Sequence, residues 1–351
     1  MKEIVAKRIK SARTLAGLSL RELSQKMEGI VSHNAITKYE NGLMMPDSKV
    51  LLALAKALDV KIDYFFRPYN VTIESVEFRK KSKLSIKNSN AIHQKVSDDV
   101  EKYIELEGFL NISSEFQKPV NHIKIHSGKD VEFAVIYLLD FWRLGTKVLP
   151  NVIELMECNA IKVIEIDANE DFEVLSGWAN KTVPFIAINK NYTLEHKRFL
   201  ALIELGHLIL SFDRALEAKT VKKLCHRFAG AMLINERTMF FLLGRSRNSI
   251  TQFELEAIKA SYGIPVLEIM SRARDLSIIN EDKFKALKIW INETEERKTE
   301  TAFKQYVGRE QSDRFKRLLY LATAEEYISM SKAANMANQD LATFRDEFIS
   351  I

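Results

Sequence analysis

The stretch Arg198–Phe212, RFLALIELGHLILSF, limits the possible folds more than any other part of the chain. Nine of the twelve residues in Phe199–Leu210 are Ala, Leu, Ile or Phe, so a helix here would be apolar nearly all round and would lie in a core. Glu204 and His207 interrupt it and share one face of the helix, being three residues apart. Burying either group costs free energy unless it finds a partner, and this placement predicts a site.

The spacing of these two residues is that of the zinc-peptidase motif H-E-x-x-H, in which two His hold the metal and the Glu activates its bound water. The first His of the motif is replaced here by Ile203, which cannot bind a metal. A catalytic zinc needs three protein ligands and an open position for water. We therefore expect no catalytic residue and no bound cofactor, with Glu204 and His207 left as a hydrogen-bonded buried pair.

A rebuilt zinc site is the alternative, because His207, Cys225 and His226 all belong to residue types that bind zinc. Cys225 and His226 are adjacent, however, and on a helix they would point about 100° apart. Nothing in the sequence marks a thiolate environment, so Cys225 is expected to be a small buried residue.

Composition and terminal sequence indicate where the protein works. The sequence has no run of eighteen apolar residues, and the start MKEIVAKRIK lacks an apolar block, so we expect neither a membrane span nor a signal peptide. The two cysteines, Cys158 and Cys225, fit a reducing compartment. A cytoplasmic protein is expected.

Positive charge is concentrated at the N-terminus. Residues 1–69 carry twelve Lys or Arg and seven Asp or Glu, which leaves forty of each kind for the rest, because the totals are 52 and 47. A small basic module on a neutral body is typical of nucleic-acid binding, since neutralising phosphates supplies most of the non-specific affinity. An ordinary basic surface patch is the alternative.

Residues 1–69 also contain the signals of five short helices. Apolar residues follow helical spacing in Ile4–Leu15, and Ser19 with Glu22 three residues later is a capping-box pattern. Further helices are expected to start near Ser32, at Pro46–Ser48 and in the IDYFF segment. Five short helices with a tight turn between the second and third are the plan of a helix-turn-helix domain.

The segments GLSLRELSQKM, AITKYENGLMMPD and LLALAKALDVKIDYFF make residues 1–69 resemble the XRE (Cro/phage-repressor) DNA-binding family. The resemblance implies a homodimer on a palindromic double-stranded operator, with the third helix in the major groove and the start of the second on phosphate. The implied DNA-binding residues are Arg21, Ser32, His33, Asn34, Thr37 and Lys38. Leu20 stands where the family commonly has Gln, so that base contact is not expected. A helical interaction module without DNA is the alternative.

Residues 70–149 are expected to be a helical connector. Its stretch RKKSKLSIK, Arg79–Lys87, carries five basic residues and no acidic one. We favour a linker there; the first turn of a helix or an additional phosphate contact are the alternatives. Helices are predicted at Asn90–Leu110 and Asp130–Leu144 from their apolar spacing.

Residues 150–245 read as an α+β domain of the small zincin plan: a short helix VIELMECN, strands IKVIEID, LSGWAN and PFIAIN, and then the apolar helix. With KLCHRFAGAMLIN, these segments resemble the ImmA/IrrE family of metallopeptidases. The resemblance implies zinc ligands at Ile203 and His207, Glu204 as the base, and a third ligand, Glu, just before the RFA segment. Val221–Lys223 has no acid there, and Glu217 lies several residues too early.

Residues 246–351 are expected to form a helical C-terminal region. Its last pair of helices, in Ser331–Phe348, has the sequence pattern of a helix-turn-helix, but the negative charges of Asp340, Asp346 and Glu347 would repel DNA phosphates. A surface for a partner protein or a second copy is the favoured interpretation.

Together these features predict a mostly helical α+β protein that represses its own operon. We expect it to be an antitoxin whose inactive peptidase-like domain binds the product of the adjacent gene, such as a toxin. A zincin binds an extended substrate along a strand edge, so LSGWAN or PFIAIN would present that edge, with Trp178 as the apolar anchor; burial of Trp178 in the domain's own core is equally expected. The alternatives are a regulator with a sensing domain and an active zinc peptidase that cleaves a repressor.

Overall fold

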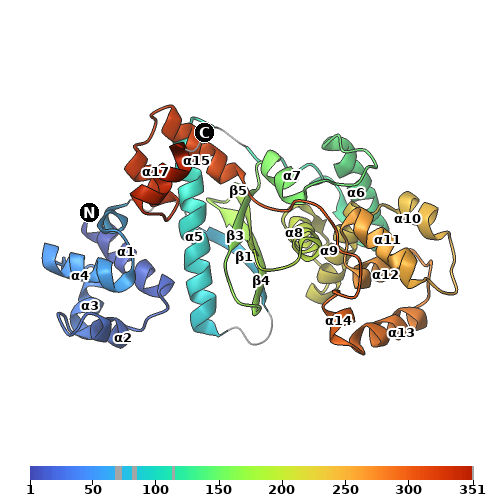
Figure 1. Cartoon of the computed structure of the whole chain (residues 1–351), viewed down its shortest axis with the longest axis horizontal. Coiled ribbons are helices and arrows are strands. Elements are labelled where there is room, and N and C mark those ends of the chain that lie inside the picture. Colours follow the sequence, from blue (N-terminus) through green and yellow to red (C-terminus); the bar gives the residue numbers. More distant parts are fainter. Residues whose placement is uncertain (68–72, 81–84, 113–114, 350–351) are drawn as a thin grey trace. The chain divides into compact units, whose positions relative to one another are not determined.

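The protein divides into two compact units in the computed structural model, which describes residues 1–67, 73–80, 85–112 and 115–349. The described parts of Met1–Glu74, Lys81–Ser113 and Arg314–Ile351 form what we call the helical unit. Those of Ser75–Lys80 and Ser114–Asp313 form the sheet unit. Figure 1 labels their elements along the chain. The predicted C-terminal segment thus contributes to both units, and the four-part domain division at residues 69, 149 and 245 stays a prediction.

Five short helices open the helical unit: α1 (Lys2–Leu15), α2 (Leu20–Lys26), α3 (His33–Glu40), α4 (Ser48–Leu58) and the 3₁₀-helix η1 (Ile62–Phe66). Ser19 accepts the Glu22 amide at 3.2 Å while Glu22 accepts the Ser19 amide at 2.6 Å, which confirms the capping box. Ser32 and Asp47 cap α3 and α4. Such caps satisfy backbone amides that have no partner inside the helix. The five predicted helices are confirmed.

A long helix, α5 (Ile86–Phe109), forms the axis of the helical unit, and α1 packs along it. The C-terminal helices α15 (Arg314–Ala324), α16 (Met330–Met336) and α17 (Leu341–Ile349) belong to the same unit. They share with α5 a core that contains Leu106, Leu319 and Phe344. The last predicted helix pair therefore buries part of its apolar surface inside the chain.

A buried ion-pair cluster joins α1 to α5. Arg8 is fully buried, and its Nη2 lies 2.7 Å from both carboxylate oxygens of Glu101. Arg67 also binds Glu101, at 2.8 Å, and binds Asp98 at 2.5 Å. Buried charges are costly unless they are paired and hydrogen-bonded, so this cluster fixes one arrangement of α1 on α5.

The sheet unit is built on four strands in the order β1-β4-β5-β3: β1 (Ile73–Lys80), β3 (Lys162–Ile166), β4 (Phe172–Ala179) and β5 (Val183–Asn189). β4 and β5 form an antiparallel hairpin, and β3 runs parallel to β5. Asn180 and Lys181 both have positive φ, as a tight hairpin turn requires. The three predicted strands of this domain are confirmed.

β1 was not predicted, and it corrects the interpretation of the basic stretch as a linker. Arg79 and Lys80 end β1, while Ser85 caps α5 and Lys87 lies in the first turn of that helix. The four residues between, 81–84, lie outside the described residues. An edge strand needs only one neighbour, so a short and partly charged segment suffices to form it.

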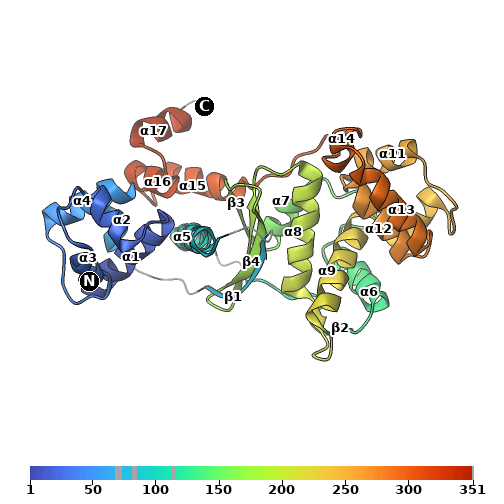
Figure 2. The same ribbon diagram turned by 90° about the horizontal axis from the view of Figure 1, so that it is seen from below.

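The predicted apolar helix is α8 (Leu194–Ile209), and it occupies the centre of the sheet unit. It packs against β4 and β5 on one side and against α9 (Ala218–Leu233) on the other, as Figure 2 shows. α6 (Gly128–Phe141) contacts α9, and α7 (Val152–Cys158) contacts α8. The burial expected for this helix from its sequence is confirmed, because Phe199–Leu205 is buried throughout.

The remaining elements complete the sheet unit. They are β2 (Lys124–Ile125), paired in parallel with β6 (Ser211–Phe212), and helices α10 (Glu236–Leu243), α11 (Gln252–Tyr262), α12 (Val266–Asp275), α13 (Glu281–Asn292) and α14 (Glu295–Lys298). The predicted class, α+β and mostly helical, is confirmed. Within the described part of the chain, none of these or the earlier helices is long and apolar enough to cross a membrane.

Candidate nucleic-acid interface and peptidase-like centre

The third helix, α3, presents a polar face to solvent. His33, Asn34 and Lys38 are exposed, whereas Ile36 and Tyr39 on the opposite side are buried in the core of the helical unit. The outward orientation predicted for these three polar residues is therefore confirmed. Amide and cationic side chains on an exposed helix can reach base edges in a major groove.

Three further predicted DNA-binding residues differ in their availability. Arg21 is exposed in the first turn of α2. The Ser32 hydroxyl accepts the Ala35 amide at 3.2 Å, so its first role is to cap α3. Thr37 is half-buried, and its hydroxyl donates to the His33 carbonyl at 3.0 Å. Arg21 is thus free to reach a phosphate, while Ser32 and Thr37 already take part in bonds within α3.

The orientation of α3 is held by an ion pair that sequence reasoning missed. Arg13 on α1 donates hydrogen bonds to both carboxylate oxygens of Glu40, the last residue of α3, at 2.6 and 2.8 Å. The hydrogen bond to Glu40 raises the pKa of Arg13. Glu40 lies in the AITKYENGLMMPD segment that resembles the XRE family, and a carboxylate there was the sequence signal of an Arg partner, because Arg binds a carboxylate through two hydrogen bonds.

The peptidase-like centre lies on α8. Ile203 is fully buried and Glu204 is 2% exposed, while His207 is half-buried. The buried carboxylate of Glu204 accepts a 2.6 Å hydrogen bond from the Ser176 hydroxyl on β4. Ser176 was not predicted; it is the one hydroxyl residue in the LSGWAN segment. The expected pairing of Glu204 with His207 stays a prediction.

Residues of α9 close the other side of this centre. Cys225 is fully buried, as predicted, and lies where α9 meets Gly206 of α8. His226 is half-buried, and its ring meets that of Phe199 edge-on at 5.7 Å. Its Nδ1 lies 3.8 Å from a carboxylate oxygen of Glu268. Cys225 and His226 therefore have different surroundings.

Zinc ligands are not gathered at this centre. Among the residues that the structure describes, no three His, Cys, Asp or Glu side chains are grouped so that they could hold a metal ion. The position of the first expected ligand is Ile203, whose side chain offers no donor atom. The described residues thus do not fit the zinc that the ImmA/IrrE resemblance implies.

The predicted strand edge needs correction, whereas the role of Trp178 as a partner anchor stays a prediction. β4 lies between β1 and β5, and β5 lies between β4 and β3, so neither strand presents a free edge. The strand edge was predicted wrongly because β1, which covers β4, was not predicted from the sequence. Trp178 is half-buried: the Phe116 ring meets it edge-on at 5.7 Å, and the Lys118 ammonium lies 5.2 Å from its centre. Burial lowers the pKa of Lys118.

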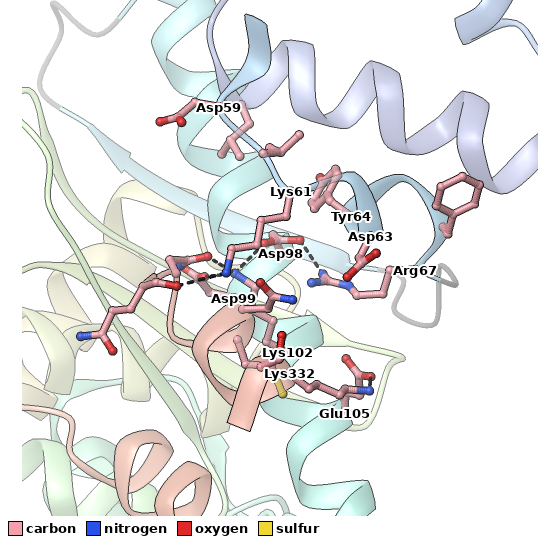
Figure 3. Close-up of a pocket in the computed structure, with 18 of the residues that line it drawn as sticks. Asp59, Lys61, Asp63, Tyr64, Arg67, Asp98, Asp99, Lys102, Glu105 and Lys332 are labelled. Atoms are coloured by element: carbon pink, nitrogen blue, oxygen red, sulfur yellow. Dashed lines mark hydrogen bonds and ion pairs between the residues drawn. The ribbon is translucent and has the colours of Figure 1, made fainter. Parts of the chain in front are cut away.

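The helical unit also contains a cavity of about 1050 Å³ whose lining includes many charged residues (Figure 3). Its walls come from the region of η1, from α5 and from α16 with the turn that follows it. Lys102 pairs with Asp98 of the same helix, α5, at 2.9 Å, and Lys332 of α16 pairs with Glu105 of α5 at 2.8 Å. Lys102 also donates to Asn338 at 2.8 Å. The bonds of Lys332 and Asn338 attach the C-terminal segment to α5.

Comparison with protein families agrees with this geometry. The family model described as helix-turn-helix matches residues 9–65, and the model described as IrrE N-terminal-like domain matches residues 156–273. The chain carries a helix-turn-helix domain and an IrrE-like domain. Comparisons with curated proteins and with solved structures found no match.

The helix-turn-helix domain runs from within α1 to η1, and the IrrE-like domain runs from within α7 to α12. Both resemblances stated from the sequence are confirmed. The helix-turn-helix domain indicates a DNA-binding regulator, and the IrrE-like domain indicates a peptidase-like region. The individual DNA-binding residues remain predictions.

Proposed function

We propose that the protein is a sequence-specific DNA-binding regulator that represses its own operon as a two-fold dimer. The observation that carries this proposal is the exposed face of α3 with His33, Asn34 and Lys38, on a domain of the helix-turn-helix family. Helices of this kind read base edges in the major groove while the preceding helix crosses the phosphate backbone. A palindromic operator follows, with half-sites about one helical turn apart.

The test is binding to the region upstream of the protein's own gene. Replacing Asn34 and Lys38 by Ala should weaken binding of the full chain to that duplex, because a base contact and a charged contact are removed. A matched control is Lys288→Ala with Asn292→Ala, which removes the same residue types from the exposed surface of α13. Affinity of the parent protein should fall steeply with salt. A parent protein that shifts no upstream DNA at low salt would refute the regulator.

The IrrE-like domain is, in this proposal, catalytically inactive and binds the product of the adjacent gene, as an antitoxin binds its toxin. The burial of Ile203 at the first ligand position supports inactivity, and the confinement of Glu204 by Ser176 is compatible with a structural role. The full chain should co-purify with the adjacent gene product when the two are expressed together. If the separately purified proteins do not associate, the antitoxin half of the proposal fails.

The competing function is an active zinc peptidase that cleaves a repressor, and Glu204 and His207 on one helix keep it testable. Metal analysis of protein purified without chelators should find well under one zinc per chain. Ile203→His should still not bind stoichiometric zinc, and the buried imidazole should cost about 1–3 kcal/mol of stability. One zinc per parent chain that is lost in His207→Ala would favour the peptidase.

A further inference from the structure

The first turn of α5 lies beside the start of the helix-turn-helix motif. Lys87 is in that turn, outside residues 9–65 that match the helix-turn-helix family. Its Cε lies 3.5 Å from the point that a Cβ on Gly17 would occupy, in the turn between α1 and α2. Its ammonium lies 3.5 Å from a carboxylate oxygen of Glu22, in the first turn of α2. A cation from another segment thus adjoins the part of the motif that faces phosphate.

The helix that carries Lys87, α5, is anchored by the buried cluster farther along the chain. Glu101 binds both Arg8 of α1 and Arg67. Arg8 and Glu101 are both buried, so water cannot replace their ion pair. Because α5 is anchored in this way, its first turn, which carries Lys87, stays near α2.

The side chains around the first turn of α2 would attract a phosphate only with the positive charge of Lys87 among them. Arg21 is the exposed cation of this turn, but its neighbour Glu22 carries a negative charge that would repel phosphate. Hydrogen bonds from Ser19 lower the pKa of Glu22, with a further contribution from the charge of Lys87, so Glu22 stays ionised. An ammonium has three donors, and the loose contact with Glu22 leaves donors for a phosphate.

Exposure also fits a ligand-binding role. The Lys87 side chain is 55% exposed and that of Glu22 is 49% exposed, so their pairing contributes little to stability. Both groups remain open to a ligand from solvent. A lysine needed only for folding would be expected to bury more of its stem or to make a closer bond.

We propose that Lys87 binds a DNA phosphate next to the one held by Arg21, so that the DNA interface extends beyond the helix-turn-helix domain onto α5. This inference rests on the proposed DNA binding. It assigns to part of the basic stretch Arg79–Lys87 a direct role in holding the duplex. Because phosphates carry no sequence information, Lys87 contributes affinity and register rather than choice of operator.

The experiment measures salt dependence with the full chain. A fluorescent duplex of the region upstream of the protein's own gene and an unrelated duplex of equal length are titrated at several KCl concentrations. Loss of one phosphate contact should reduce the slope of log K against log salt by about 0.9. Lys87→Ala should show this loss on both duplexes, with binding at low salt weakened about two- to fivefold, the range of one exposed ion pair. Lys87→Arg should retain most of the slope.

Two controls separate this role from a structural one. Lys95→Ala removes a lysine from the same helix at the cavity and should leave the slope unchanged. Glu22→Gln keeps the capping-box geometry but removes the charge that Lys87 neutralises. In that background Lys87→Ala should still reduce the slope; if the effect disappears, Lys87 only neutralises Glu22 and the inference is overturned.

The outcomes distinguish this inference from the proposed function. A parent protein that binds neither duplex overturns both. A parent protein that binds while Lys87→Ala keeps its slope overturns the contact and leaves the regulator standing. Unchanged unfolding temperatures of the variants would show that the loss is one of binding, as expected for a side chain exposed to solvent.

Discussion

Glu101→Gln should destabilise the helical unit more than Glu105→Gln, the same substitution one turn later on α5. The change keeps the shape of the side chain but removes the charge that pairs with Arg8 and Arg67. The Arg8 and Glu101 side chains are 1% and 7% exposed, so water cannot take over the lost interaction. Breaking a buried ion pair from one side costs about 3–5 kcal/mol. Asp98, 3.7 Å from Arg8 and 2.5 Å from Arg67, offsets part of this, so we expect a loss of about 3 kcal/mol, at the lower end of that range.

Hydrogen exchange is the suitable assay, because a protein of two units need not unfold in one step. Slowly exchanging amides of α1 and α5 should exchange about 100-fold faster in Glu101→Gln, whereas those of α8 in the sheet unit should not change. The control is Glu105→Gln, one turn later on α5, whose partner Lys332 is 42% exposed; its cost should be at most about 1 kcal/mol. If Glu101→Gln and Glu105→Gln accelerate exchange equally, the argument that Glu101→Gln leaves the charge of Arg8 buried without its partner is refuted.

Three further predictions test other parts of the structure. Gly206→Ala should destabilise the sheet unit by about 1–3 kcal/mol in calorimetry, because the added Cβ would lie 3.2 Å from the Phe228 ring; Gly108→Ala, with open space around it on α5, should not be destabilising. Ser176→Ala should cost about 1–3 kcal/mol in the same assay, since Glu204 loses a hydrogen bond in a buried place; no loss would mean that the carboxylate has other sufficient partners. Burial is the largest single influence on the pKa of Asp98 and raises it, but the positive charges of Lys102 and Arg67 together outweigh burial and lower that pKa. Ionised Asp98 therefore stabilises the fold above the ordinary Asp pKa of about 4, and this stabilisation is lost as the pH falls through the lowered pKa. Hydrogen exchange in α5 should show this loss on acidification, and Asp98→Asn should show less of it.

Local chemistry explains what the sequence could predict. Ser19 with Glu22, Ser32 and Asp47 each cap a helix within three residues, so these helix starts can be found without any distant contact. The continuous apolar character of α8 likewise marks a buried helix by itself. The polar face of α3 follows from the same periodicity.

Contacts between distant residues explain what could not be predicted. Arg8 and Glu101 are 93 positions apart, and Ser176 and Glu204 are 28 apart, and no local pattern brings either pair together. The edge expected at β4 depended on whether another strand covered it, and that strand, β1, ends in the first two residues of the basic stretch that was expected to be a linker. The apolar spacing around Leu106 predicts a helix, but it does not indicate that this residue shares a core with Phe344.

The separation of Leu106 from Phe344 also has a consequence for synthesis of the protein. The ribosome makes the helix-turn-helix domain and α5 first, but roughly 240 residues lie between the two core positions, and these take about 10–50 seconds at typical elongation rates. During that interval the apolar side of α5 lacks the helices that cover it in the finished helical unit. A nascent chain would thus expose the apolar face of α5 beside a nearly finished helix-turn-helix domain, and a product that ends before α17 would be prone to aggregation.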